Sequence, residues 1–192
     1  MKFIIYFLVS ISAIFSAEEK TAIFAGGCFW CNESLFEKVN GVIAVESGYT
    51  GGHKVNPSYE EVCTGNTGHF EAVKVTYDPK KISYKKLVEE FWKQIDPTDF
   101  DGQFADKGSQ YRTAIFYNSD EEKKIALQSK EDLQKSKKYS FSKIATQVLK
   151  TSVFYPAEDY HQDYYKKNPN RYKQYFKGSG REDFLKKDLQ TY

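Results

Sequence analysis

Two cysteines separated by two residues carry the strongest chemical signal in this sequence. Cys28 and Cys31 lie in the segment GGCFWC at 26–31. Apolar spacing predicts a helix over 28–39 whose first turn holds Cys28. The positive end of a helix dipole and its free backbone N–H groups favour a thiolate over a thiol. The position therefore predicts a reactive Cys28, and Cys31 follows at a spacing that can close a small disulfide.

The spacing of the two thiols leaves other interpretations open. They could be buried structural thiols, or half of a zinc site. The residues that would have to complete a zinc site show no second paired motif: Cys63, His53, His69 and His161. Phe29 and Trp30 directly follow the first thiol and offer an aromatic wall for an apolar group such as a methyl or a thioether.

The elements that must position these side chains are short strands and helices in a mixed order. Apolar patterning predicts strands at 21–27, 42–49, 69–77 and 111–117, and one or two short strands within 145–155. It predicts helices over 28–39, over 83–95 with Ser83 as N-cap, over 119–137, and a Tyr-rich helical segment over 157–167. The stretches 50–58 and 96–110 are predicted loops. This order favours the α+β class, a two-layer sandwich with a mixed or antiparallel sheet and packed helices.

Length and composition predict one compact domain. The 192 residues include 15 Tyr, 15 Phe and 2 Trp, which give the chain ample surface to bury. A net charge of +2 argues against a dedicated nucleic-acid binder, whose footprint would be strongly basic. We expect a single domain over 18–192 in which the polar, basic tail after Asn168 wraps loosely.

The first 17 residues are typical of a secretory signal peptide. Lys2 precedes an apolar run from Phe3 to Phe15, and the small residues Ser16 and Ala17 follow it. The run is short for a hydrocarbon core of ~30 Å, which argues against a permanent membrane anchor. The alternative is an apolar segment packed on the domain. The prediction is a cleaved leader over 1–17 and an exported protein, periplasmic or secreted.

Four blocks of sequence together resemble one enzyme family, peptide methionine sulfoxide reductase of the A type. The blocks are GGCFWC at 26–31, YEEVCTGNTGHFEAV at 59–73, DKGSQYRTAIFY at 106–117 and FYPAEDYHQDYY at 154–165. The resemblance implies a ferredoxin-like α+β fold and an enzyme that reduces methionine S-sulfoxide, free or within proteins. It implies no cofactor, no metal, and a thioredoxin or thioredoxin-like reductant as partner.

The resemblance also implies roles for individual residues. Cys28 matches the nucleophile, which attacks the sulfoxide sulfur and becomes a sulfenic acid. Glu71 matches the acid that protonates the sulfoxide oxygen, and burial should raise its pKa above that of a free glutamate. Five further residues match the substrate pocket: Phe29 and Trp30 hold the S-methyl group, Tyr59 and Tyr111 hydrogen-bond the oxygen, and Asp106 adds a polar group.

The sequence departs from the commonest family pattern in its cysteines. Many relatives carry resolving cysteines in a C-terminal tail, whereas no cysteine follows Cys63 here, and many have Gly at the position of Cys31. We therefore hypothesise that Cys31 attacks the Cys28 sulfenic acid to form a disulfide. Cys63 is expected to be a buried core thiol that serves as the back-up resolver, and an external thiol is the third possibility.

Two functions of other classes compete with this interpretation. A thioredoxin-like disulfide oxidoreductase would use the same Cys28 and Cys31 but would give no role to Glu71 or the pocket tyrosines. A non-catalytic module could bind oxidised or Met-rich peptides through an aromatic pocket. Among the histidines, His69 and His161 are expected to make structural hydrogen bonds, and His53 could contact a peptide substrate.

Overall fold

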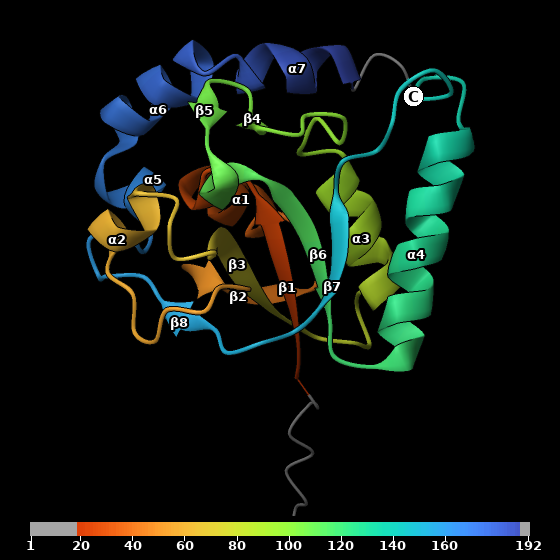
Figure 1. Ribbon diagram of the computed structural model, residues 1–192, viewed down its shortest axis with the longest axis horizontal. Coiled ribbons are helices and arrows are strands. Elements are labelled where there is room, and N and C mark those ends of the chain that lie inside the picture. The colour runs from red at the N-terminus through yellow and green to blue at the C-terminus, as the bar shows by residue number, and fades with distance from the viewer. Residues whose placement is uncertain (1–18, 189–192) are drawn as a thin grey trace, which may run out of the picture.

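The computed structural model describes residues 19–188, and a mixed six-stranded sheet forms its centre (Figure 1). The strand order is β7-β6-β1-β3-β2-β8. Its strands are β1 (Lys20–Gly26), β2 (Val42–Thr50), β3 (Phe70–Tyr77), β6 (Thr113–Tyr117), β7 (Gln147–Lys150) and β8 (Tyr155–Pro156). Within this sheet of the described residues, β6 and β7 pair in parallel, and the other neighbouring strands pair antiparallel. A separate two-stranded hairpin joins β4 (Gly102–Gln103) to β5 (Asp106–Lys107).

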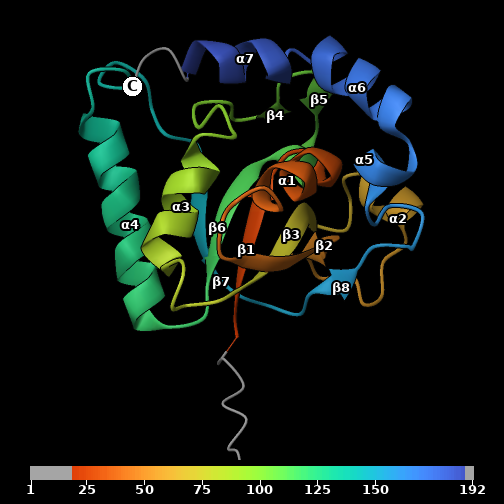
Figure 2. The ribbon, with the colours of Figure 1, turned by 180° about the vertical axis from the view of Figure 1, so that it is seen from behind.

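Helices cover the sheet and extend along one of its ends. They are α1 (Phe29–Phe36), α2 (Tyr59–Cys63), α3 (Tyr84–Trp92), α4 (Asp120–Lys135), α5 (Tyr164–Lys167), α6 (Pro169–Gly178) and α7 (Arg181–Asp188), with a 3-10 helix η1 (Ser109–Tyr111). Figure 2 shows α1 and α3 in front of the sheet, with α6 and α7 above α1. The prediction of the α+β class with a mixed sheet and packed helices is confirmed.

The main core lies between the sheet and the two helices α1 and α3. Phe24 of β1 stacks on Phe36 of α1 and on Phe91 of α3, with ring centroids 5.0 and 5.1 Å apart. The opposite face of β1 is also buried, because Ile23 and Ala25 join a second apolar cluster. A strand buried on both faces explains why 21–27 reads as a nearly continuous apolar run. This core holds the end of β1 in place, directly before the turn that leads to Cys28 and Cys31.

Serine caps set the start of several helices. Ser83 Oγ accepts the backbone N–H of Lys86 (3.2 Å), which confirms Ser83 as the N-cap of α3. Ser58 forms a capping box with Glu61 at the start of α2. This short helix directly follows the predicted loop 50–58 and was not itself predicted. A Ser-x-x-Glu pattern was the signal available for it.

Three boundaries differ from the sequence prediction. Cys28 is the N-cap of α1, with φ −53° and ψ 119°, and so lies just before the first turn. Tyr111 belongs to η1, and β6 starts only at Thr113. Of the helical segment predicted over 157–167, only the last turn, α5, is an α-helix.

The prediction of a loosely wrapped tail after Asn168 is wrong. Helices α6 and α7 follow that residue and run across the end of the molecule at which α1 begins (Figure 1, Figure 2). Tyr172, Tyr175 and Phe176 lie half-buried on one face of α6, at the i, i+3, i+4 spacing of a helix that packs on one side. Arg181 at the start of α7 is fully buried.

The predicted leader over 1–17 lies outside the described residues. Within residues 19–188, no helix is both long enough and apolar enough to cross a lipid bilayer.

Candidate active site

The reactive-cysteine motif lies at the turn between β1 and α1. Gly27 has a φ of +81°, and a Cβ at this position would lie 2.6 Å from Cβ of Gln103. The turn therefore requires glycine. Cys28 follows as the N-cap of α1, with 5% of its surface exposed, and Cys31 one turn later is fully buried. The turn places both thiols side by side beneath α6.

Glu71 reaches the same turn from the neighbouring strand. Strand β3 pairs with β1, and the backbone N–H of Phe29 donates to Glu71 Oε2 (3.1 Å). Glu71 is 1% exposed, and burial, reinforced by the charge of Cys28, raises its pKa well above the usual glutamate range. The carboxyl group therefore holds a proton near neutral pH, in the direction expected from the sequence.

The two thiols differ in their acidity. Burial raises the pKa of Cys28 well above its usual value, and Cys31 and Asp106 raise it further. Burial also opposes ionisation of Cys31, but a hydrogen bond from Cys28 and the positive charge of Arg181 lower its pKa below the usual value. In the substrate-free protein, burial therefore opposes the thiolate that the helix-start position favours at Cys28. Negative charge in the pair is favoured on Cys31.

The two predicted oxygen-binding tyrosines lie together next to Glu71. Tyr59 on α2 and Tyr111 in η1 both hydrogen-bond the sulfur of Cys63. Burial raises the pKa of both tyrosines, and the charge of Glu71 adds to the effect. The two hydroxyl groups therefore remain protonated donors at neutral pH.

Cys63 is exposed, so its prediction as a buried core thiol is wrong. Helix α2 has only five residues and buries Val62, which turns the adjacent Cys63 away from the core. Its sulfur nevertheless contacts the hydroxyls of Tyr59 and Tyr111, at the edge of the site.

The predicted aromatic wall consists of one buried and one half-buried ring. Phe29 is buried among Tyr59, His161 and its neighbours, whereas Trp30 keeps part of its surface exposed. Trp30 stacks on Tyr164 with ring centroids 3.7 Å apart, and its indole N–H donates to His161 Nδ1 (3.0 Å). His161 therefore makes the structural hydrogen bond that was expected of it.

Asp106 joins the site through the C-terminal helices. Tyr175 on α6 donates its hydroxyl hydrogen to Asp106 Oδ2 (2.6 Å), and the same hydroxyl group lies beside Cys28. Burial raises the pKa of Asp106, while Tyr175 and Arg181 oppose that rise. Tyr172 hydrogen-bonds Cys31. Sequence reasoning missed Tyr172, Tyr175 and Arg181, although the aromatic spacing on α6 was a signal that could have found the first two.

Known proteins of one family match this chain over most of its length. A family model described as peptide methionine sulfoxide reductase matches residues 20–192. The chain belongs to this family. It is 56% identical to the reductase MsrA of Bacillus licheniformis over 168 residues, which cover 88% of this chain and 92% of the relative. It is 53% identical to MsrA of Bacillus subtilis over 170 residues, covering 88% and 96%.

Solved structures agree with the family assignment. Reduced Mxr1 from Saccharomyces cerevisiae matches with a TM-score of 0.74 and 36% identity, covering 80% of this chain and 87% of that one. Methionine sulfoxide reductase A of Corynebacterium diphtheriae matches with a TM-score of 0.71 and 33% identity, covering 81% and 77%. The chain is thus an enzyme that reduces methionine sulfoxide, which the sequence resemblance predicted, and the thioredoxin-like and binding-module alternatives lose their basis.

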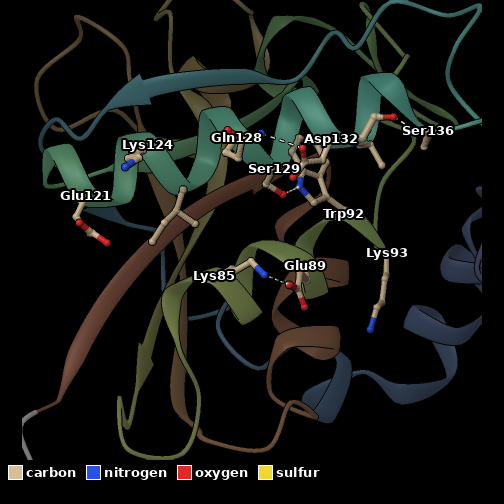
Figure 3. Close-up of a pocket in the computed structure, with 12 residues that line it drawn as sticks. Lys85, Glu89, Trp92, Lys93, Glu121, Lys124, Gln128, Ser129, Asp132 and Ser136 are labelled. Atoms are coloured by element: carbon tan, nitrogen blue, oxygen red, sulfur yellow. Dashed lines mark hydrogen bonds and ion pairs between the residues drawn. The ribbon is translucent and has the colours of Figure 1, made fainter.

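Two further features of the reductase lie apart from the thiols. Carboxylate oxygens of Glu33, Glu37 and Asp163 lie within 4.8 Å of one another, but the ammonium of Lys166 already binds Glu37 Oε2 (2.6 Å) and Asp163 Oδ1 (2.7 Å). A groove of about 560 Å³ runs between α3 and α4, where Trp92 donates to Ser129 Oγ (Figure 3). None of the predicted site residues lines this groove.

Proposed function

We propose that this reductase acts on the S epimer of methionine sulfoxide, free or within proteins, with Cys28 as its nucleophile. The observation that carries the proposal is the joint burial of Cys28 and Glu71 beside the backbone N–H of Phe29, with the pKa of Glu71 raised by that burial. A nucleophile and an acid held together in this way are what sulfoxide reduction requires, because oxide cannot leave without a proton.

The first step transfers oxygen from the substrate to Cys28. The Cys28 thiolate attacks the sulfoxide sulfur and an S–S bond forms, while Glu71 gives its proton to the sulfoxide oxygen. The resulting hydroxyl group then passes to the sulfur of Cys28, so that the S–O and S–S bonds of the substrate sulfur break, methionine leaves, and Cys28 becomes a sulfenic acid. The proton that Cys28 lost on ionisation replaces the one that Glu71 gave, so the step consumes no proton overall. The hydroxyls of Tyr59 and Tyr111 remain protonated and can donate to the developing oxygen. The raised pKa of Cys28 indicates that its proton must leave as the substrate binds.

The second step restores the thiol pair to a form that a reductant can recognise. We propose that Cys31 resolves the sulfenic acid, giving a Cys28–Cys31 disulfide and water. Cys31 already hydrogen-bonds Cys28 and is the more acidic thiol of the two. Cys63 is the back-up resolver, since its exposed sulfur lies on the two pocket tyrosines.

A thioredoxin or thioredoxin-like protein is the proposed reductant. Yeast Mxr1, whose reduced form resembles this chain, has also been solved in complex with Trx2. A disulfide between cysteines three residues apart is a substrate that such dithiol proteins reduce by thiol–disulfide exchange.

We further propose that residues 1–17 form a cleaved leader that exports the enzyme to the periplasm or the medium. The support is the basic start, the apolar run and the small residues before Glu18. Amino-terminal sequencing of the protein recovered from outside the cytoplasm tests it. A mature start at Ala17 or Glu18 is expected, and an intact Met1 in exported material would contradict cleavage.

The test of the reductase proposal uses the separated epimers of a methionine sulfoxide peptide. With thioredoxin, thioredoxin reductase and NADPH, the S epimer should be consumed and the R epimer left intact. Insulin disulfides, offered in parallel, should be reduced no faster than in the thioredoxin control alone. Consumption of the R epimer, or insulin reduction without sulfoxide reduction, would contradict the proposal.

A further inference from the structure

Arg181 is a buried positive charge with no carboxylate to pair with. It is fully buried, and among residues 19–188 it forms no ion pair within 4.0 Å. Its Nη1 donates to the carbonyl of Gln94 (2.9 Å) and its Nη2 to that of Gly26 (3.2 Å), while Nε has no partner in the described chain. A buried guanidinium with only neutral partners is costly unless an anion lies nearby.

The guanidinium lies on the turn that precedes the two thiols. Its bond to the carbonyl of Gly26 ties it to the end of β1, and a Cβ built on Gly27 would lie 3.1 Å from Nη2. The Phe104 ring covers it, with the guanidinium carbon 4.6 Å from the ring centroid. Arg181 is therefore held against the turn, beneath the Phe104 ring.

The charge of Arg181 changes the pKa values of two ionisable groups. It lowers the pKa of Cys31 and opposes the burial that raises the pKa of Asp106. Asp106 already accepts the Tyr175 hydroxyl hydrogen, so one of its oxygens is satisfied from α6. The groups that act on Cys31 come from α1, α6, α7 and β5: Cys28, Tyr172, Arg181 and Asp106.

We propose that Arg181 is the counter-ion of the Cys31 thiolate and thereby a positioning residue for the resolving step. The inference rests on the proposed role of Cys31 as the resolver. In many relatives the C-terminal segment carries the resolving cysteines. In this chain it carries Arg181, whose charge stabilises the thiolate of the proposed resolver Cys31.

The resolving step balances without an outside reactant. The Cys31 thiolate attacks the sulfur of the Cys28 sulfenic acid, an S–S bond forms, and the S–O bond breaks with its electron pair going to hydroxide. The proton that Cys31 lost on ionisation completes water. Arg181 favours this step because it stabilises the anion that starts it.

The test is a single turnover of the full chain with a methionine S-sulfoxide peptide and no reductant. Samples quenched at intervals with a thiol-alkylating reagent give the methionine formed and the Cys28–Cys31 disulfide formed, between pH 6 and 9. Arg181→Gln should still yield one methionine per chain. Its disulfide should form about tenfold or more slowly at pH 7, with the half-maximal rate moved up by about one pH unit or more.

Two controls separate charge from packing. Arg181→Lys keeps the charge and should recover most of the disulfide rate, whereas Lys177→Met removes an exposed charge from the same segment and should change nothing. A disulfide rate and pH midpoint in Arg181→Gln equal to those of the wild type would overturn the role of Arg181. A wild type that forms methionine but no Cys28–Cys31 disulfide would overturn the proposed resolver instead, and this inference with it.

A second measurement applies even if Arg181→Gln does not fold. In the Cys63→Ser protein, which keeps Cys28 and Arg181, thiolate absorbance at 240 nm follows the Cys28–Cys31 pair. We expect the first of the two thiols to be half ionised below the ordinary thiol value of about 8.5, because the hydrogen bond from Cys28 and the charge of Arg181 both favour the Cys31 thiolate. A first midpoint at or above about 8.5 would overturn the proposal.

Discussion

The two ends of the chain contribute to the thiol site in different ways. The turn between β1 and α1, with β3 beside it, supplies the groups that can react: the two thiols and the Glu71 carboxyl. Helices α6 and α7 supply hydroxyls and a guanidinium that contact those groups. The first region contains the reacting atoms, and the second contributes to the pKa values of the two thiols. Reactivity at this site is therefore a joint property of a local motif and a remote covering layer.

The largest effect is expected from the first region. Cys28→Ser should lower the rate of methionine formation by on the order of 10³-fold or more, because it removes the nucleophile. Quantifying methionine after a single turnover measures it, with thermal unfolding as the control for folding. Methionine formation at the wild-type rate would place the reaction on another thiol.

Loss of the acid should cost somewhat less. Glu71→Gln is expected to slow methionine formation by about 10²- to 10³-fold, since general acid catalysis contributes in this range. The acid works in its protonated form, so wild-type activity should fall as pH rises through the raised pKa of Glu71, and Glu71→Gln should lose that limb of the profile. If Glu71→Gln left the pH profile unchanged, the fall of activity at high pH would arise from another group.

Sequence reasoning succeeded in the first region for a physical reason. β1, β3 and the cap at Ser83 follow from patterns within a few residues, which tertiary contacts reinforce. The thiol at Cys28 shows the limit, because its helix-terminal position is local whereas the burial that raises its pKa depends on tertiary packing. The burial of Arg181 depends on partners 87 and 155 residues away, and no local pattern announces them.

A moderate effect is expected from the second region. Tyr175→Phe removes the hydrogen bond to the half-buried Asp106, beside Cys28. One such bond contributes about 1 kcal/mol, so kcat/KM should fall by roughly 3- to 10-fold. Steady-state kinetics with the peptide sulfoxide measures it, and Tyr165→Phe on neighbouring α5 is a matched control. A loss as large as that of Glu71→Gln would mean that the covering layer reacts rather than positions.

The last effect concerns stability rather than rate, at a contact between α1 and the residue that precedes α5. Glu33 on α1 accepts the backbone N–H of Asp163 (3.0 Å), next to Glu37 and Lys166. Burial, reinforced by the charges of Asp163 and Glu37, raises the pKa of Glu33 to about 7. The folded protein therefore holds a proton that the unfolded chain releases above about 4.5, so this group lowers stability as pH rises from about 4.5 to 7.

Glu33→Gln should remove that pH-dependent loss. We expect it to raise the free energy of unfolding at pH 8 by roughly 1–3 kcal/mol and to change little at pH 4.5. Urea unfolding at the two pH values measures the difference. An equal effect at both would show that Glu33 stays ionised in the folded protein and that the contact acts by shape alone.

The most direct test of the account is the state of the cysteines after one turnover. The full chain is mixed with a methionine S-sulfoxide peptide, without reductant, and is then alkylated and mapped by peptide mass. The account predicts one methionine per chain, Cys28 and Cys31 joined as a disulfide, and Cys63 alkylated. Methionine formed with Cys31 alkylated would contradict the local resolver, and no methionine at all would contradict the role of Cys28.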